Sequence, residues 1–158
     1  NMLGCELGGH FEKHRDLYKI VDGKNPILEH EYIGKPVDGK DIIIVDDMIA
    51  SGESMLDVAR ELKKRGAKRI YLFSSYAMFT KGVDVFENAY EEGMFTKLFA
   101  TNLSYIPKEA LEKPWIEIAD CSEYLAKIIY TFHIGGSVSP ILEARSKVLE
   151  EFAKNETK

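Results

Sequence analysis

The chain has 158 residues, a length that fits one domain with its own hydrophobic core. Apolar residues make up 45% and charged residues 30%, which is typical of a globular protein and excludes a disordered or fibrous class. The net charge of -5 argues against a general nucleic-acid binder, because such proteins present a basic face to phosphates. The one dense basic run, Lys63 to Arg69, falls where a helix is expected to end, and cations there complement the helix dipole.

The cysteine content and the hydropathy pattern indicate in which cellular compartment the protein is expected. Cys5 and Cys121 lie far apart with no CxxC spacing, so the sequence predicts neither a zinc site nor a disulfide framework. We therefore expect a cytoplasmic protein with reduced thiols. No apolar stretch approaches the roughly 20 residues that a membrane helix needs, and the N-terminus lacks a basic region followed by an apolar one. Neither membrane insertion nor secretion is expected.

The first two predicted elements are a long polar segment and a short apolar one. Residues Glu12 to Gly39 are rich in charged residues, Gly, Pro and His, and their apolar residues follow neither a helical nor a strand period. This pattern predicts a long loop with room for one short strand. Long loops in compact domains are more often functional than idle. Asp41 to Val45 is β-branched and apolar after its first residue, which predicts a strand buried on both faces of a parallel sheet.

The remaining elements alternate the helical and strand patterns. A helix is predicted from Ser54 to the stop at Gly66, because apolar residues recur there at helical spacing: Met55, Val58, Ala59 and Leu62. With the next strand it forms a right-handed parallel crossover. The later predictions are strands at Ile70–Phe73, Lys97–Thr101 and Ile116–Ile118, and helices at Asp84–Gly93, Ser122–His133 and Pro140–Lys158. The class is α/β, with a mostly parallel sheet flanked by helices.

Polar residues follow the first apolar strand at the edge of the sheet where α/β proteins collect ligands. Asp46 and Asp47 stand at its carboxyl end, and Ser51, Gly52 and Ser54 open the next helix. Unpaired N–H groups at a helix start attract an anion, and carboxylates suit hydroxyls or Mg²⁺. A pair of aspartates at a strand end can equally well cap a turn or a helix.

The string from Asp41 to Ser54 resembles the ribose-phosphate-binding loop of the type I phosphoribosyltransferase fold. That loop follows an apolar strand with two acidic residues, two apolar residues and a Thr/Gly-rich turn. The order FEKHRD, NPILEHEYIGKPVDGKDIIIVDD, LKKRGAKRIYLFSS, FATN, CSEYLAKII and SVSPIL is similar to the C-terminal half of ribose-phosphate pyrophosphokinases, from about Leu3 to Leu142. The Lys-x-Arg ahead of the loop and SVSPIL after it narrow the resemblance to this family.

The resemblance implies a single phosphoribosyltransferase-like domain over residues 1–158. It would be the C-terminal domain of a two-domain synthetase, without that domain's first strand and helix, and with a mobile catalytic loop at residues 12–39. The implied reaction transfers pyrophosphate from MgATP to ribose 5-phosphate and yields phosphoribosyl pyrophosphate and AMP. The implied partners are ribose 5-phosphate, ATP, the N-terminal half of the same enzyme and, when intact, further copies. A chain without that half is expected to be inactive alone.

The resemblance also assigns roles to residues. The 5-phosphate would be held by the loop residues Ala50, Ser51, Gly52, Glu53 and Ser54. Asp46 and Asp47 would hold the ribose hydroxyls and their Mg²⁺. Lys13 and Arg15 would be catalytic, because they would neutralise charge on the group being transferred.

Two of the loop's departures from the family's usual Asp-Thr-Gly-Gly-Thr change its charge and keep alternatives open. Ala50 removes a carboxylate, and Glu53 adds a negative charge beside the phosphate position. These departures favour a non-catalytic, synthetase-like regulatory or scaffold subunit. Another alternative is a phosphoribosyltransferase that consumes phosphoribosyl pyrophosphate, which would need a segment that recognises a base.

Overall fold

The computed structural model describes residues 5–15, 27–143, 148–150 and 153–154. It divides the chain into two compact units. One unit comprises Gly8–Ala119, and the other comprises Asn1–Leu7 together with Asp120–Lys158. Each unit is described by itself below.

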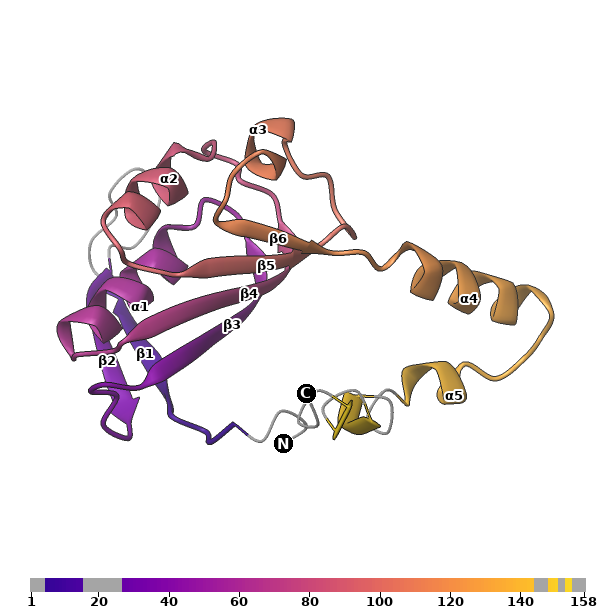
Figure 1. The fold of residues 1–158 in the computed structure, drawn as a ribbon, viewed down its shortest axis with the longest axis horizontal. Coiled ribbons are helices and arrows are strands. Elements are labelled where there is room, and N and C mark those ends of the chain that lie inside the picture. The colour runs from indigo at the N-terminus through magenta and orange to yellow at the C-terminus, as the bar shows by residue number, and fades with distance from the viewer. Residues whose placement is uncertain (1–4, 16–26, 144–147, 151–152, 155–158) are drawn as a thin grey trace. The chain divides into compact units, whose positions relative to one another are not determined.

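The larger unit contains a parallel sheet of four strands in the order β3-β4-β5-β6 and a two-stranded hairpin, β1-β2 (Figure 1). The strands are β1 (Gly9–Arg15), β2 (Ile27–Gly34), β3 (Asp41–Ile49), β4 (Arg69–Ala77), β5 (Lys97–Thr101) and β6 (Ile116–Ala119). The helices of this unit are α1 (Glu53–Lys64), α2 (Asp84–Glu91) and α3 (Lys108–Leu111). The predicted α/β class with a parallel sheet and flanking helices is confirmed.

β3 extends further than its apolar run suggested. The strand continues through Asp46 and Asp47 to Ile49 and pairs in parallel with β4, so that Asp46 lies opposite Ser74 and Ile49 opposite Ala77. Backbone pairing with β4 therefore carries the strand past its β-branched residues, where side-chain propensity alone gave no signal.

α1 confirms the helix that was predicted from the spacing of apolar residues. Its buried side chains are Met55, Leu56, Ala59 and Leu62. The helix ends where the sequence indicated, because Gly66 has a φ of 88° and its N–H donates to the carbonyl oxygen of Lys63 at 3.0 Å. α2 and β5 also lie where they were predicted, whereas the short helix α3 was missed.

The two faces of the four-stranded sheet differ in burial. Side chains from α1, α2 and α3 join one face in a continuous core that contains Leu56, Ile70, Leu72, Phe86, Leu98, Ala110 and Trp115. On the other face Ile43 is 40% and Val45 75% exposed. The prediction that this strand is buried on both faces is therefore wrong for the described residues. Alternate residues of a strand point to opposite faces, and the described helices of this unit bury only one of them.

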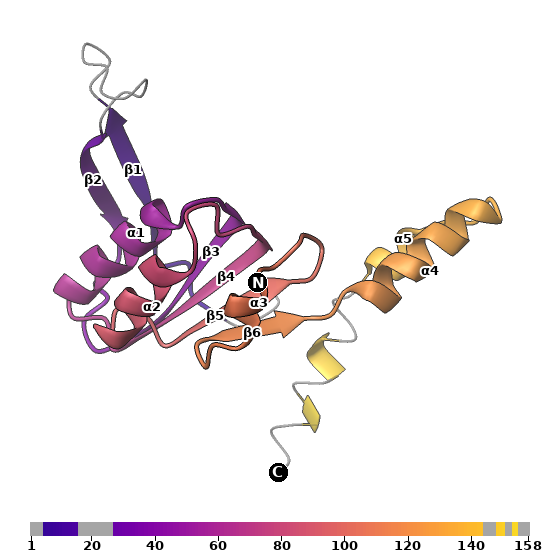
Figure 2. The same ribbon diagram turned by 90° about the horizontal axis from the view of Figure 1, so that it is seen from above.

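Two described parts of the segment that was predicted as one long loop, residues 12–15 and 27–34, belong to the strands of the hairpin, and residues 16–26 of that prediction lie outside the described residues. β1 and β2 pair antiparallel, with Gly9 opposite Gly34 and Lys13 opposite His30. Phe11 and Tyr32 contact each other at 5.2 Å between ring centroids and pack against the core. Figure 2 shows the hairpin extending away from the sheet and helices of this unit. Its many charged residues hide the strand period in the sequence, whereas the backbone pairing of the two strands is seen only in the folded chain.

The smaller unit contains α4 (Ser122–His133) and α5 (Ser139–Leu142). The Tyr124 hydroxyl donates to the carbonyl oxygen of Ile141 at 3.0 Å and links the two helices. α4 has the predicted bounds, but none of its residues is buried. α5 covers the start of the terminal helix predicted over Pro140–Lys158, residues 148–150 and 153–154 are also helical, and the other residues of that prediction after Glu143 lie outside the described residues.

Within the described ranges, no helix combines the length and the apolar character needed to cross a bilayer.

Candidate functional site

The two predicted aspartates lie next to each other near the carboxyl end of β3. Both side chains are exposed, and the backbone N–H of Asp47 donates to Asp46 Oδ1 at 2.9 Å. On the neighbouring strand the Ser74 hydroxyl donates to the carbonyl oxygen of Tyr76 at 3.1 Å. The structure thus places the aspartates at the predicted edge of the sheet, within the strand rather than just beyond it.

The alternation of partly buried and exposed side chains along β3 is interrupted at the aspartate pair. Ile44 and Ile42 face the core side, yet Ile49 is buried and Met48 exposed, so the alternation changes phase between Asp46 and Ile49. Both carboxylates are exposed at this point, where a ligand can reach them.

The aspartate pair fits Mg²⁺ as a ligand set only with help from other oxygens. In the part of the chain that the structure describes, no group of three or more His, Cys, Asp or Glu is placed to hold a metal ion. Mg²⁺ is commonly bound by one or two carboxylates together with water and substrate oxygens. Two exposed adjacent carboxylates match that pattern, and a site of this kind depends on substrate.

The loop after β3 is held against the segment that follows β4. The N–H of Met78 donates to the carbonyl oxygen of Ile49 at 2.9 Å, and the N–H of Thr80 donates to that of Ala50 at 2.8 Å. These two bonds fix the path of the loop before α1 begins. The backbone donors at the start of α1 are therefore presented from a defined position.

Gly52 is required by its backbone conformation and by its surroundings. Its φ is 85°, and a Cβ atom at this position would lie 2.1 Å from the ring of Phe86. L-residues with a side chain rarely adopt this conformation, and the ring belongs to the buried core. The loop therefore rests directly on the core through the one residue type that fits.

The start of α1 has a glycine, which carries no side chain, as its N-cap residue. Gly52 is the N-cap residue, its carbonyl oxygen accepts from the N–H of Leu56 at 3.0 Å, and no side chain in the described residues caps the helix. The first N–H groups of a helix have no partner within the helix, and the helix dipole favours a negative charge there. This end of α1 can accept an anion such as a phosphate.

Glu53 does not stand alone at this helix start. Its carboxylate lies 2.8 Å from Lys81 Nζ, and the Ser51 hydroxyl donates to it at 3.4 Å. Lys81 is a residue that the sequence reasoning missed, because it is separated from Glu53 by 28 positions and belongs to no motif. Only the folded chain brings the two charges together.

The other predicted residues are on the hairpin. Lys13 and Arg15 lie on β1, and their side chains are outside the described residues. The register places the backbone of Lys13 opposite His30, and Arg15 follows an irregularity in the pairing. The structure brings Asp46, Asp47 and the loop together in one segment, and it does not place the two cations relative to them.

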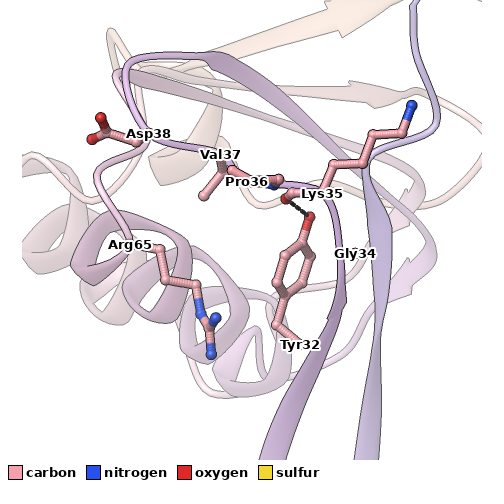
Figure 3. A pocket seen from close by; sticks show the side chains of 7 residues that line it. All are labelled: Tyr32, Gly34, Lys35, Pro36, Val37, Asp38 and Arg65. Atoms are coloured by element: carbon pink, nitrogen blue, oxygen red, sulfur yellow. Dashed lines mark hydrogen bonds between the residues drawn. The ribbon is translucent and has the colours of Figure 1, made fainter.

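A pocket of 260 Å³ lies at the base of the hairpin (Figure 3). It is lined by Tyr32, Gly34, Lys35, Pro36, Val37, Asp38 and Arg65. The Arg65 guanidinium lies 5.3 Å from the Tyr32 ring centroid, and the Tyr32 hydroxyl donates to the carbonyl oxygen of Lys35 at 2.9 Å. In Figure 3 the Lys35 and Asp38 side chains point away from each other. The polar groups do not converge on a ligand, and their contacts anchor the hairpin to the end of α1.

The first residue of β3 carries the strongest described charge pairing of that strand. Asp41 accepts a hydrogen bond from Arg69 Nε at 2.9 Å, and a second from the same guanidinium. These hydrogen bonds lower the pKa of Asp41 below its ordinary value, and the charge of Arg69 adds to the effect. The pair joins the starts of β3 and β4, at the end of the sheet opposite the aspartates and the loop.

Comparisons with known proteins identify what this arrangement resembles. Residues 12–143 match the family model described as the phosphoribosyl synthetase-associated domain. A ribose-phosphate pyrophosphokinase of Mycoplasmopsis pulmonis is 31% identical over 66% of this chain and 32% of its own length. One from Synechococcus elongatus is 29% identical over 81% of this chain and 36% of its own length. The chain therefore spans about a third of the length of the curated relatives that it matches.

A solved structure shares the fold. The crystal structure of phosphoribosylpyrophosphate synthetase from Mycobacterium smegmatis superposes with a TM-score of 0.60 at 22% sequence identity. The match covers 70% of this chain and 36% of that one. The predicted type I phosphoribosyltransferase-like fold is confirmed by this likeness together with the parallel sheet.

Proposed function

Because this chain belongs to the phosphoribosyl synthetase-associated domain family, we propose that it supplies the ribose 5-phosphate site of a ribose-phosphate pyrophosphokinase. One observation carries the proposal. The family match, over residues 12–143, includes the two hairpin cations, the aspartate pair and the start of α1. The reaction of the whole enzyme would transfer pyrophosphate from ATP to the anomeric hydroxyl of ribose 5-phosphate.

The loop from Ala50 to Ser54 binds the 5-phosphate in this proposal. Support comes from the start of α1, where the N-cap residue makes no side-chain cap, and from the two backbone hydrogen bonds that fix the path of the loop. Preorganised N–H groups need no rearrangement to bind an anion. Glu53 is paired with Lys81, so its carboxylate does not present an uncompensated charge to the phosphate. This pairing answers the objection that Glu53 raises from sequence alone.

The aspartates hold the sugar in the same proposal. Asp46 and Asp47 accept hydrogen bonds from the ribose hydroxyls, because ionised carboxylates act as acceptors. Their exposure at the carboxyl end of β3 supports this role. Mg²⁺, when bound by these carboxylates and substrate oxygens, would supply positive charge that offsets the charge of the phosphates.

Lys13 and Arg15 complete the proposed machinery from the hairpin. Each would stabilise negative charge that develops on the transferring group, as cations do in phosphoryl transfer generally. ATP, the N-terminal half of the same enzyme, which the resemblance implies, and self-association of the intact enzyme belong to the same proposal. The chain by itself is expected to bind ribose 5-phosphate without consuming ATP.

A non-catalytic, synthetase-like subunit is the second candidate. Ala50 and Glu53 favour it, because they are the two loop residues that depart from the usual pattern in charge. In that case the fold would persist while the loop no longer binds the sugar phosphate. Ligand binding separates the two candidates.

Calorimetric titration with ribose 5-phosphate, with and without Mg²⁺, tests the proposal. The variant is the double change Asp46→Ala, Asp47→Ala, and the matched control is Glu91→Ala, Glu92→Ala, an exposed adjacent pair at the end of α2. We expect saturable binding by the chain and by the control, and loss of binding in the aspartate variant. Absence of binding by the folded chain up to millimolar ligand would instead support the scaffold candidate.

A further inference from the structure

The aromatic side chain of Tyr32 links the base of the hairpin to the C-terminal end of α1. Tyr32 lies on β2, and the Arg65 guanidinium lies 5.3 Å from its ring centroid (Figure 3). Arg65 directly follows α1, and its Nε donates to Glu61 Oε1 at 2.9 Å, so the guanidinium is held in place from the helix. The Tyr32 hydroxyl donates to the carbonyl oxygen of Lys35 at 2.9 Å. Both the face and the tip of the ring are therefore fixed.

Two glycines allow the Tyr32 side chain to lie across the base of the hairpin. Gly9 and Gly34 are opposite each other in the register of the two strands. A Cβ atom at Gly9 would lie 2.5 Å from the carbonyl oxygen of Ile33 and 2.9 Å from the Tyr32 ring. A Cβ atom at Gly34 would lie 2.6 Å from the Tyr32 hydroxyl. The backbone of both strands thus approaches the Tyr32 side chain closely at this point.

Backbone hydrogen bonds connect the chain after the hairpin to the same end of α1. The N–H of Lys35 donates to the carbonyl oxygen of Gly8, and the N–H of Gly39 donates to that of Gly66, each at 2.8 Å. Val37 lies between these two donors and is 5% exposed. The base of the hairpin and the end of α1 are therefore connected through backbone, core and side-chain contacts.

The length of the hairpin makes the geometry of its base important for its cations. Figure 2 shows the hairpin extending away from the sheet and helices of its unit. Lys13 and Arg15 follow Gly9 on β1, and at about 3.4 Å per residue their backbones lie about 14 and 20 Å from it along the strand. A tilt of about 10° at the base would move them by roughly 2–4 Å over these lengths. A displacement of about 1 Å in a catalytic group can lower a rate about a hundredfold.

The contact of Arg65 with Tyr32 contributes more to the orientation of the hairpin than to the stability of the fold. The Arg65 side chain is 44% exposed, and a cation over an aromatic ring at an exposed site stabilises a protein only modestly. A two-stranded hairpin is marginally stable by itself in water, so its direction depends on what its base contacts. Tyr32 and Arg65 are contacts of that kind.

We propose that Arg65 and Tyr32 are positioning residues, which fix the angle at which the hairpin leaves the domain and thereby the place that Lys13 and Arg15 reach. The inference rests on the proposed function of those two cations. Arg65 and Tyr32 act through the hairpin and need not contact a ligand. The other end of α1 carries the proposed phosphate loop, so this helix relates the sugar-phosphate site to the hairpin cations.

Calorimetry of the chain in the presence of Mg²⁺, with two ligands that differ in one group, tests the inference. Phosphoribosyl pyrophosphate carries the pyrophosphoryl group that Lys13 and Arg15 would contact, and ribose 5-phosphate lacks that group. The aspartates and the loop would serve both ligands equally. The chain should bind phosphoribosyl pyrophosphate more tightly, and the double variant Lys13→Ala, Arg15→Ala should remove most of the difference.

Three further variants change the contact at the base of the hairpin. Arg65→Met should weaken binding of phosphoribosyl pyrophosphate by about threefold to tenfold, the size expected for a lost cation–π contact, and leave that of ribose 5-phosphate within about twofold. Tyr32→Leu should act in the same direction. Arg65→Lys should retain most of the affinity, because an ammonium group also binds over a ring. Arg65→Met should add less than about twofold when Lys13 and Arg15 are already replaced, because it acts through them.

The matched control is Arg60→Met, which removes the same charge from the same helix. Arg60 is 43% exposed, and its guanidinium lies 2.9 Å from Asp57 on α1, much as Arg65 pairs with Glu61. The control should leave both affinities within about twofold of the unmodified chain. Urea unfolding of each variant detects any general loss of structure.

The outcomes separate the inference from the proposed function. If the unmodified folded chain binds neither ligand, the proposed function fails and the inference falls with it. If the chain binds ribose 5-phosphate, but Arg65→Met keeps the full affinity for phosphoribosyl pyrophosphate or weakens both ligands equally, only the inference is wrong. It is also wrong if replacing Lys13 and Arg15 has no effect, because the hairpin then has nothing to position. An equal loss from Arg65→Met with and without the two cations would mean that Arg65 acts on the ligand directly, which overturns its positioning role.

Discussion

The two faces of the parallel sheet are formed by the same strands but have different environments. On the covered face, Leu72 and Leu98 are fully buried beneath α1 and α2, whereas Val45 on the open face is 75% exposed. The strands supply apolar side chains to both faces, and Phe73 and Phe99 stack on each other at 4.7 Å between ring centroids. The apolar residues of a strand thus favour burial, and the elements that pack around the strand determine which of its faces is buried.

The proposed site depends on the covered face. Trp115 is fully buried and contacts the rings of Phe79, Phe86 and Phe95. Two of these rings lie next to residues of the proposed site. Phe86 packs against Gly52, and Phe79 fixes the turn that contains Lys81. The aromatic core therefore connects stability to the shape of the loop.

The largest expected effect follows from removal of one of these rings. Phe86→Ala should lower the free energy of unfolding by about 3–5 kcal/mol, because it deletes a fully buried aromatic side chain and leaves a cavity. It should also weaken binding of ribose 5-phosphate, since Gly52 loses the ring against which it rests. Urea unfolding measures the first effect and calorimetry the second. A loss below about 1 kcal/mol would mean that the core repacks and that the covered face is less rigid than its burial indicates.

The sequence predicted the parallel part of the fold because its signals were local. The apolar run of β3, the helical spacing of α1 and the glycine that ends it each specify an element within a few residues. The hairpin β1-β2 was missed, because its strands are rich in charge and, among the side chains that the structure describes, Phe11 and Tyr32 pack against the core. The open face of β3 was also missed, since a strand alone does not reveal its neighbours.

The candidate site also consists of residues that the sequence predicted and residues that it did not. Asp46, Asp47 and the loop were found because they adjoin each other in sequence. Lys81 was not found, because its contact with Glu53 depends on β4 and on the strained turn at Phe79. The functional roles of all these residues stay predictions, and the binding experiments above are their test.

A smaller effect is expected where a charge supports the covered face. Glu87 on α2 accepts a hydrogen bond from Trp115 Nε1 at 2.6 Å and lies 3.1 Å from Lys113 Nζ. The hydrogen bond from Trp115, and then the contacts with Lys113, lower the pKa of Glu87 below its ordinary value. The folded state therefore favours the ionised carboxylate. This contribution to stability is present above the unfolded-state pKa and is lost as the pH falls through the lower folded-state pKa.

Glu87→Gln should accordingly destabilise the chain at neutral pH, by less than Phe86→Ala does. The difference in unfolding free energy between the variant and the unmodified chain should shrink as the pH falls below about 4. Urea unfolding at several pH values measures it, with the exposed Glu91→Gln as the control. A difference that stays constant over this range would mean that the ionisation of Glu87 contributes nothing and that the loss reflects hydrogen-bond geometry alone.

The smallest effect is expected on the open face. Val45→Thr replaces a methyl group by a hydroxyl with little change of shape, and at a side chain that is 75% exposed it should alter the free energy of unfolding by less than about 0.5 kcal/mol. The same change at Val37, which is 5% exposed, should cost about 1–3 kcal/mol, because the new hydroxyl is taken out of water. Urea unfolding of both variants measures the effect of burial on the free energy of unfolding, because the chemical change is the same at the two positions. If Val45→Thr costs as much as Val37→Thr, Val45 is buried in solution, and the contrast between the two faces of the sheet would no longer hold.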